Sequence, residues 1–440
     1  METQSASKGY TVTAAATGIN LALGVLYTWS IFKSAIKHSI EQGGAGAFNW
    51  DAASINDPYA VCCLVFAFSM ILAGRCQDKF GPRLTAAAGG VMVGAGLLWI
   101  SRTTDYTSWV LGFGVLAGIG IAFGYSSATP PAIKWFPPNK TGKIAGIVVS
   151  GFGLASVYIA PLSKYLVASW GVQGAMMFFG VAFAIVVCLL STFLVNPPPG
   201  YVPHGFECRR SPSPLNAQAR ATFEDVNSSP GEMLRTSSFW LLWLLYFIGA
   251  GAGLMVIGSV AGMAQKSMGA NAFFAVVMLA VGNAGGRIAA GTLSDKIGRP
   301  KTLGIVFTIQ AMLMFAAIPI TGATGASAAI TALLVLLSAA IGFNYGANLS
   351  LFPSFAKDMW GIKNFGMNYG VLFTAWGVGG FVMSKASERL ATATGTFSSA
   401  FLLAGIMLLL GSTLTFFVKD EKSRKRAIVA KVLQDATAKA

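Results

Sequence analysis

Arg287 and Asn283 carry the clearest chemistry in this sequence. They lie four residues apart in an apolar run, so one helical turn places them on one face. A guanidinium is a planar, charged fork that matches the two oxygens of a carboxylate. We therefore predict that Arg287 binds the carboxylate of a small organic acid. Asn283 is expected to orient that fork or to hydrogen-bond a hydroxy or keto group.

Structural roles compete with this hypothesis. An arginine at the centre of a bilayer costs at least about 2.5–3.5 kcal/mol, so it normally has a partner or a wet cavity. Arg287 stands eight residues before Asp295, about 12 Å along a helix. From there it could extend to the inner membrane surface or bond a neighbouring helix. Asn283 could equally be a hydrogen bond between helices.

Composition identifies the elements that must position this pair. The chain is 54% hydrophobic and 11% charged, with a mean hydropathy of +0.64, outside the range of soluble domains. About twelve apolar runs approach the roughly 20 residues that cross a bilayer. We predict an all-α integral membrane protein with spans near 11–32, 57–73, 84–101, 109–133, 144–167, 176–194, 239–263, 271–292, 302–320, 328–351, 369–384 and 400–417.

The net charge of +15 is explained by the membrane rather than by nucleic acid. If both termini are cytoplasmic, most lysines and arginines fall in inner loops, as the positive-inside rule requires. No nucleic-acid recognition module accompanies the charge. Residues 419–440 are predicted to form a basic cytoplasmic tail, of which Lys419 to Arg426 is expected to lie against anionic lipid headgroups.

The second half of the chain repeats the first. The stretch from Gly74 to Arg83 and the stretch from Gly291 to Arg299 both read Gly-x-x-x-Asp-Lys-x-Gly, with an arginine at the end. Phe136-Pro137 and Phe352-Pro353 recur at nearly the same offset, which indicates a duplication. We predict an N-terminal six-helix half (1–196), a cytoplasmic linker (197–237) and a C-terminal six-helix half (238–418). Such bundles bind substrate near the midplane, between the halves.

Enzyme chemistry has no support in the spans, which offer no histidine and no paired carboxylates. The five cysteines show neither a metal-ligand nor a disulfide framework, so we expect no cofactor and no metal. A transporter-like sensor is the remaining alternative from another class.

These features resemble the major facilitator superfamily over essentially the whole chain, and within it the branch of monocarboxylate transporters and oxalate/formate antiporters. The doubled turn, the two halves and the central inner loop carry the superfamily resemblance. Further segments carry the branch resemblance; they are Tyr27-Thr-Trp29-Ser-Ile-Phe32, Lys134-Trp135-Phe136-Pro137, Gly231-Glu-Met-Leu-Arg235, Phe239-Trp240, Arg287 and Asn368-Tyr369-Gly370.

The resemblance implies the major facilitator fold, two six-helix halves related by a pseudo-twofold axis. It also implies alternating access by rocking of the halves, with Arg287 as the carboxylate-binding residue. Two departures matter. The oxalate antiporter has a lysine in the eleventh span where this chain has Trp376, which disfavours the dianion oxalate. Animal proton-coupled members have an aspartate where this chain has Asn283, which questions a built-in proton carrier.

Four further residues are predicted to line the cavity. Tyr125 and Tyr345 occupy comparable places before the two Phe-Pro segments, and a tyrosine hydroxyl can donate to a substrate. Tyr27 follows the family pattern, and Trp376 is expected to narrow the cavity. Packing is the alternative role for each of the four.

The repeated turns are predicted to form an inner latch. Its members, Asp78, Arg83, Asp295 and Arg299, would hold the inner gate in one state. A purely structural turn is the alternative.

One buried cation suits one carboxylate, so we expect transport of lactate, pyruvate or a similar small monocarboxylate. Coupling is open between a proton and a counter-anion, because no predicted span outside the turns contains Asp or Glu except Asp57 at the very end of one. The expected location is the inner membrane, with both termini cytoplasmic and a monomer as the working unit.

Overall fold

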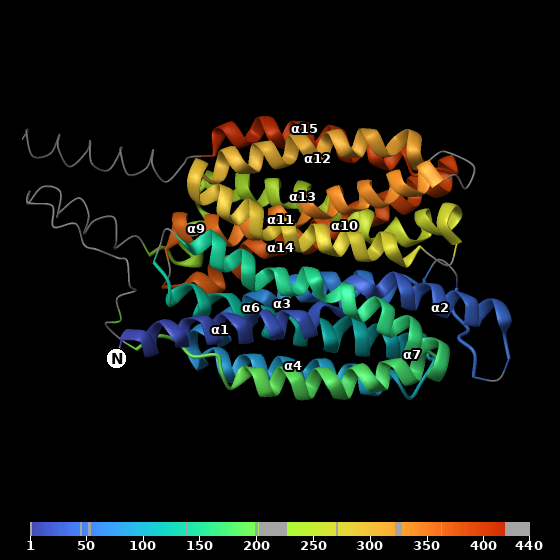
Figure 1. The fold of residues 1–440 in the computed structure, drawn as a ribbon, viewed down its shortest axis with the longest axis horizontal. Coiled ribbons are helices and arrows are strands. Elements are labelled where there is room, and N and C mark those ends of the chain that lie inside the picture. Colours follow the sequence, from blue (N-terminus) through green and yellow to red (C-terminus); the bar gives the residue numbers. More distant parts are fainter. Residues whose placement is uncertain are drawn as a thin grey trace, which may run out of the picture.

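Apolar runs of the sequence form long helices that lie side by side (Figure 1). The computed structural model describes residues 2–44, 46–51, 54–137, 140–198, 201, 227–269, 272–321, 328–361 and 363–418. Its first half comprises α1 (Glu2–Leu23), η1 (Gly24–Thr28), α2 (Trp29–Gln42), α3 (Asp57–Phe80), α4 (Pro82–Ile100), α5 (Tyr106–Trp109), η2 (Val110–Ala117), α6 (Gly118–Lys134) and α7 (Thr141–Ser191). The second half comprises α9 (Pro230–Leu234), α10 (Ser237–Met268), α11 (Phe273–Ile297), α12 (Arg299–Thr321), α13 (Ala328–Trp360), α14 (Phe365–Thr394), α15 (Ser398–Leu414) and η5 (Thr415–Phe417).

The all-helical membrane architecture predicted from the sequence is confirmed. Among the described residues, ten helices are long and apolar enough to cross a membrane. One of them, Gly142–Ser191, contains two of the predicted spans. They join at Gly171, whose φ of 71° lies in the left-handed region that glycine tolerates. The predicted eleventh span lies in α14, which packs against α3 and α10.

The domain boundaries stay a prediction, and parts of them fall outside the described residues. Residues 202–226 of the predicted linker and the basic tail, 419–440, are among these. The end of the linker is described, because Ser229 caps the short helix α9. The Ser229 N–H donates to the Glu232 carboxylate at 2.7 Å, and this bond lowers the pKa of the Glu232 carboxyl.

Both copies of the repeated turn lie at one end of the bundle, which we call the turn end and which is on the left in Figure 1. Gly81 ends α3 with a φ of 86°, and Gly298 ends α11 with a φ of 95°. Glycine accepts these left-handed conformations without strain, and so the chain can reverse directly into the next helix. The opposite end, which carries the segment between α2 and α3, we call the loop end.

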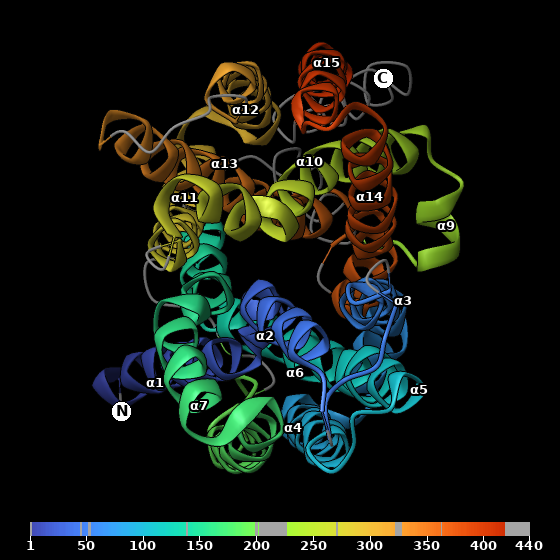
Figure 2. The same cartoon turned by 90° about the vertical axis from the view of Figure 1, so that its right-hand side faces the viewer.

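Two helix pairs join the halves, and Figure 2 shows them from the loop end: α14 lies on α3, and α11 lies on α7. Glycines bring the backbones together in both pairs. A Cβ added at Gly74 would collide with the Gly366 carbonyl, and one added at Gly291 would collide with the Gly142 carbonyl. The halves are therefore tightly closed against each other near the turn end.

Polar contacts between the halves exist at both ends of the bundle. At the turn end, the Asp78 carboxylate accepts the Met367 N–H at 3.3 Å, and the Asp295 carboxylate accepts the Lys143 N–H at 3.1 Å. At the loop end, the Lys385 ammonium lies 3.2 Å from the Asp57 carboxylate. Polar contacts thus join the halves on both sides of the centre of the bundle.

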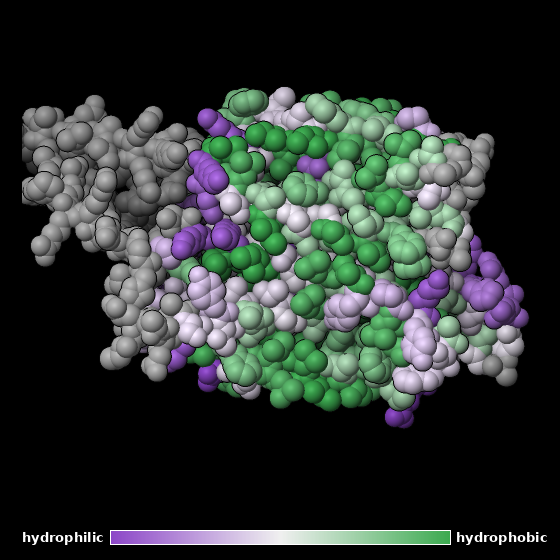
Figure 3. All heavy atoms as spheres, viewed as in Figure 1, coloured by the Kyte–Doolittle hydropathy of each residue, from purple (hydrophilic) through white to green (hydrophobic). Residues whose placement is uncertain are grey.

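The outer surface of the bundle is apolar. In Figure 3 hydrophobic residues cover the middle of the visible face, and hydrophilic residues gather toward its two ends. Large exposed side chains on the helices include Leu72, Leu84, Leu189, Met312, Leu336 and Leu410. A band of this kind faces lipid tails, since a soluble surface of this size would be covered by polar side chains.

Candidate functional site

Arg287 lies in the middle of α11, at the interface with α7, and its side chain is fully buried. Its Nε donates to the Asn283 Oδ1 at 2.8 Å, so one helical turn brings the two predicted residues into direct contact. Its Nη1 donates to the carbonyl of Val149 on α7. Its Nη2 is 3.4 Å from the Tyr27 hydroxyl, a long contact that leaves most of the bonding capacity of that nitrogen unused.

The Arg287 charge is not neutralised by the protein around it. Within the described part of the chain, no ion pair joins Arg287 to a carboxylate. All its partners are neutral oxygens of an amide, a carbonyl and a hydroxyl. A buried charge is costly unless it is paired, so this arrangement favours an anion that completes the site.

Tyr27, Tyr345 and Trp376 form a hydrogen-bonded row beside Arg287. The two tyrosine hydroxyls are 2.6 Å apart, and the indole N–H of Trp376 donates to the Tyr345 hydroxyl at 2.9 Å. Donors therefore stand at both ends of the tyrosine pair, the indole at one and Arg287 at the other. One hydroxyl hydrogen lies between the tyrosines, and the other meets no acceptor in the described part of the chain.

Two more buried donors near Arg287 have no partner among the described residues. They are the Nδ2 of Asn283, whose Oδ1 is occupied by Arg287, and the hydroxyl of Tyr125. The Tyr125 hydroxyl faces the Arg287 guanidinium. Leaving a buried donor unsatisfied costs about 1–3 kcal/mol. The site thus offers several N–H and O–H groups around one positive charge, and its acceptors are neutral oxygens rather than carboxylates.

Aromatic rings wall this donor-rich centre. Phe152 contacts the rings of Tyr27 and Tyr125, with centroids 5.0 and 5.4 Å apart. Phe66 contacts Tyr125 at 5.6 Å and Trp376 at 5.3 Å. The rings exclude water, which strengthens the electrostatic interactions of any anion held inside.

The local fold explains the placement of Tyr27. It lies in η1, a short 3₁₀ segment between α1 and α2, within the first predicted span. The tighter winding changes the direction of side chains relative to a continuous α-helix. A Cβ at Gly24, the first residue of η1, would collide with Ala155 on α7, so a glycine is required where the two helices approach.

The structure brings together all six predicted substrate-binding residues, Arg287, Asn283, Tyr345, Tyr125, Tyr27 and Trp376, in one buried cluster. Their role in binding substrate stays a prediction. Sequence reasoning missed the carbonyl of Val149 and the walls formed by Phe66, Phe152 and Phe373. A backbone carbonyl carries no residue signal, and a phenylalanine in an apolar span looks like any other core residue.

The structure places the four predicted latch residues in different surroundings. Arg299 lies 2.7 Å from Asp295 and 3.0 Å from Asp358, and it also donates to Ser294. Asp78 contacts the start of α14 as described above. Arg83 is exposed, and no ion pair links it to Asp78 within the described ranges. Asp358 is a member of the charged cluster that the sequence did not indicate.

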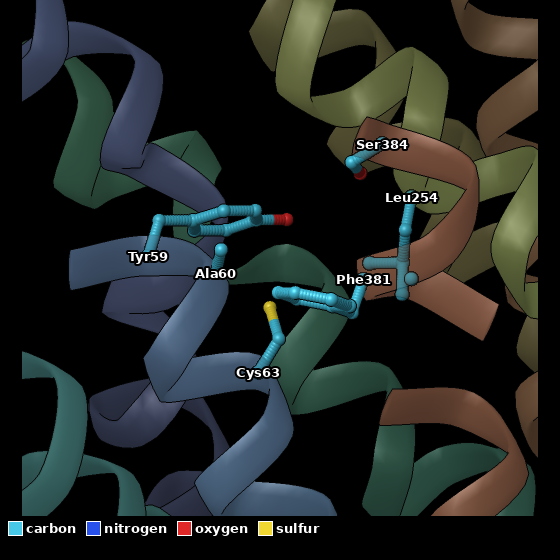
Figure 4. Close-up of a pocket in the computed structure, with 7 residues that line it drawn as sticks. Tyr59, Ala60, Cys63, Leu254, Phe381 and Ser384 are labelled. Atoms are coloured by element: carbon cyan, nitrogen blue, oxygen red, sulfur yellow. The ribbon is translucent and has the colours of Figure 1, made fainter. Parts of the chain in front are cut away.

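A small apolar pocket lies between the halves, on the loop-end side of the aromatic walls (Figure 4). Its volume is about 10 Å³, room for about one water molecule. Tyr59 and Cys63 of α3 face Leu254 of α10 and Ser384 of α14 across it. No charged side chain lines the pocket, so the chemistry that recognises an anion is concentrated at Arg287.

The sequence profile of the Major Facilitator Superfamily matches residues 10–384. The chain belongs to the Major Facilitator Superfamily. The resemblance predicted from the repeated turns is therefore confirmed. The fold agrees, because a crystal structure of a doubly tryptophan-substituted XylE superposes with a TM-score of 0.73 over 96% of this chain and 99% of that one. The sequence identity to XylE is 15%, so this likeness concerns the fold alone.

Relatives in the superfamily include transporters of small organic anions by name. The chain is 29% identical to the oxalate:formate antiporter of Oxalobacter formigenes, over 91% of this chain and 89% of that one. It is 25% identical to monocarboxylate transporter 13 of Bos taurus, over 89% of this chain and 84% of that one. It is also 25% identical to the MFS-type transporter YhjX of Escherichia coli K12, over 81% and 82%. This protein is a multi-pass membrane transporter of the superfamily.

Proposed function

We propose that this protein is a secondary active transporter of small monocarboxylates such as lactate and pyruvate, with Arg287 binding the substrate carboxylate. The observation that carries the proposal is the set of unpartnered buried donors around an unneutralised guanidinium. A carboxylate supplies the negative charge that this cluster lacks, together with acceptor oxygens for these donors. The relatives named above, which include a monocarboxylate transporter and an oxalate:formate antiporter, support the same class of substrate.

The proposed pose uses the unpartnered donors on either side of Arg287. The carboxylate bonds the Nη groups of Arg287 and takes the free hydroxyl hydrogen of the Tyr27–Tyr345 pair. The amide N–H of Asn283 is then available for a 2-hydroxy or 2-oxo oxygen. Trp376 stands where a second cation would be needed for a dianion, so the site favours one carboxylate over two.

We propose that transport requires the contacts at the two ends of the bundle to open in turn. We propose that this protein lies in the inner membrane, with the turn end and both termini facing the cytoplasm. Basic residues near the turn end accord with the positive-inside rule; they include Lys79, Lys140, Lys143, Lys296 and Lys301. The halves then rock about the central site, opening the turn end or the loop end in alternation.

Coupling to a proton is the mode we propose first, with the proton carried by the substrate. No carboxylate pairs with Arg287 in the described part of the chain, so the residues themselves offer no proton carrier beside the substrate. The second candidate is obligatory anion exchange. It is favoured by the same unpaired charge, because an empty site would have to move the Arg287 charge without an anion.

The experiment is uptake of labelled L-lactate and labelled pyruvate into proteoliposomes whose interior is alkaline and contains no carboxylate anion. Accumulation above equilibrium supports proton symport. Uptake that appears only when unlabelled lactate, pyruvate or formate is loaded inside supports exchange. Failure to transport any of these acids in either mode contradicts the proposed function.

A further inference from the structure

Three tyrosines from three helices surround the ring of Phe373, on the side of Arg287 that leads toward the turn end. Tyr125 comes from α6, Tyr246 from α10 and Tyr369 from α14. Their ring centroids lie 5.6, 6.0 and 5.7 Å from that of Phe373. The Tyr369 hydroxyl faces those of both Tyr125 and Tyr246, so the three polar tips converge. We call these residues the tyrosine triad.

The three hydroxyls are buried and unsatisfied. The residues are 3%, 0% and 5% exposed, and none of the hydroxyls makes a hydrogen bond of normal geometry with a described residue. Buried hydroxyls in folded proteins are almost always hydrogen-bonded, since an unpaired one is destabilising. Three such groups from three helices at one point therefore form a polar position that can donate hydrogen bonds to the oxygens of a ligand.

The position of the triad relates it to the substrate path. Tyr125 faces the Arg287 guanidinium as well as Tyr369, so the triad begins where the central site ends. Tyr369 is two residues beyond Met367, whose N–H is bound by Asp78 at the turn end. Through Tyr125 and Tyr369, the triad thus connects the surroundings of Arg287 with the contact at the turn end.

The triad also belongs to both halves. Tyr125 is part of the first half, whereas Tyr246 and Tyr369 are part of the second. In the alternating access proposed above, opening of the turn end would separate α14 from α3 and carry Tyr369 away from Tyr125. The three hydroxyls would then converge only while the turn end is closed or closing.

We propose that the tyrosine triad is a second, weaker binding position for the substrate carboxylate, occupied between Arg287 and the turn end. This inference rests on the proposed function, because it takes the same anion from the same arginine. Three O–H groups can donate hydrogen bonds to a carboxylate as it leaves the guanidinium, so the carboxylate exchanges its hydrogen bonds rather than losing them. Neutral donors hold an anion less tightly than a second cation, and they come apart when the turn end opens, which releases it.

The test uses the full-length chain with Tyr246→Phe, Tyr369→Phe and the two combined. Each change removes one oxygen and keeps the ring against Phe373. The equilibrium Kd for pyruvate is measured by calorimetry on purified protein, and the exchange rate by counterflow of labelled pyruvate in proteoliposomes. We expect the Kd to stay within about twofold and exchange to slow about three- to tenfold, the effect of losing one net hydrogen bond.

The melting temperature separates this role from structural support. Replacing an unsatisfied buried hydroxyl by hydrogen does not destabilise the fold, so the variants are expected to melt no lower than the wild type. The matched control is Tyr59→Phe, because the Tyr59 hydroxyl is equally buried and unpartnered but lies beside the loop-end pocket. Its exchange rate is expected to equal that of the wild type.

Two outcomes overturn the inference and leave the proposed function standing. One is an unchanged exchange rate in the double variant while the wild type binds and exchanges pyruvate. The other is a Kd that weakens in step with the rate and with the melting temperature, which indicates structural support of the Arg287 site. Absence of binding and exchange of pyruvate, lactate, formate and oxalate by the wild type removes the proposed function and the inference together.

Discussion

The helix pairs that join the two halves make the same backbone contacts with different side chains. In the α3–α14 pair, Gly370 lies against the Met70 carbonyl; in the α11–α7 pair, Gly146 lies against the Arg287 carbonyl. With Gly74 matched to Gly291, Arg287 corresponds to Met70. By the same spacing, Asn283 corresponds to Phe66.

The comparison shows what the duplication kept and what it changed. Close backbone contact is required in both halves, because it closes the bundle near the turn end. The residues one and two turns above it differ. In α11 they are the charge and its amide partner, and in α3 they are apolar, with Phe66 forming a wall of the same site. The groups that can recognise an anion thus lie on α11, and α3 supplies an apolar wall of the same site.

The repeated turns differ in a similar way. The second turn reads Gly298-Arg299-Pro300, and the first reads Gly81-Pro82-Arg83. Arg299 is therefore four residues from Asp295 and pairs with it across the reversal at Gly298, whereas Arg83 is five residues from Asp78 and makes no ion pair with it in the described part of the chain. A shift of one residue removes an ion pair from an otherwise similar turn.

The largest effect is expected at the centre. Arg287→Gln makes this position uncharged, as its counterpart Met70 is in the other half. The Kd for pyruvate should then rise at least about 30-fold, the loss seen when a buried charged hydrogen-bond partner is removed. Arg287→Lys keeps the charge but loses the planar fork, so its Kd for pyruvate should lie between those of the wild type and Arg287→Gln. Calorimetric titration of both variants measures these losses.

Stability provides the control for that prediction. Arg287 is an unpaired buried charge, so its removal should leave the melting temperature unchanged or higher. An Arg287→Gln protein that binds and transports pyruvate like the wild type contradicts the assignment of Arg287 as the carboxylate ligand.

A smaller effect is expected from the turns. Arg299→Gln removes the cation that the half-buried carboxylates of Asp295 and Asp358 share and should destabilise the fold by about 3 kcal/mol. Arg83→Gln, the same change in the other turn, should cost less than about 0.5 kcal/mol, because the side chain is exposed. Melting temperatures in detergent compare the two variants. Equal losses would show that the one-residue shift has no energetic consequence.

The smallest effect tests the shift directly. The double variant P82R/R83P gives the first turn the order of the second and places an arginine four residues after Asp78. We expect a gain of about 0.3–0.5 kcal/mol, typical of an ion pair on an exposed surface. The melting temperature should rise slightly in low salt and less in high salt, since salt screens a surface pair. A fall in both buffers contradicts this reading of the turn.

Much of the fold could be predicted, because membranes impose strong rules on sequence. Long apolar runs gave the helices, and the repeated Asp-Lys-x-Gly turns gave the duplication. The members of the site were predicted for a related reason. Arg287 is conspicuous because a charge inside a span is costly, and Asn283 follows it at helical spacing.

The remaining features depend on tertiary contacts that leave no local signal. Val149 contributes a carbonyl, which every residue has, and Phe66 contributes a ring in a span full of apolar side chains. The pairing of Arg299 with Asp358 joins residues that only the packing of α12 against α13 brings together. Tyr246 was not singled out either, because its role depends on which helices its hydroxyl faces.

The indole N–H of Trp376 has a further consequence, for optical measurement. Its bond to Tyr345 places one of the ten tryptophans of the chain at the end of the hydrogen-bonded row that reaches Arg287. An anion that takes a hydroxyl hydrogen from that row redistributes charge beside the indole, and tryptophan emission responds to such local fields. The protein therefore contains its own fluorophore for binding titrations, and the difference between the wild type and Trp376→Phe isolates the signal.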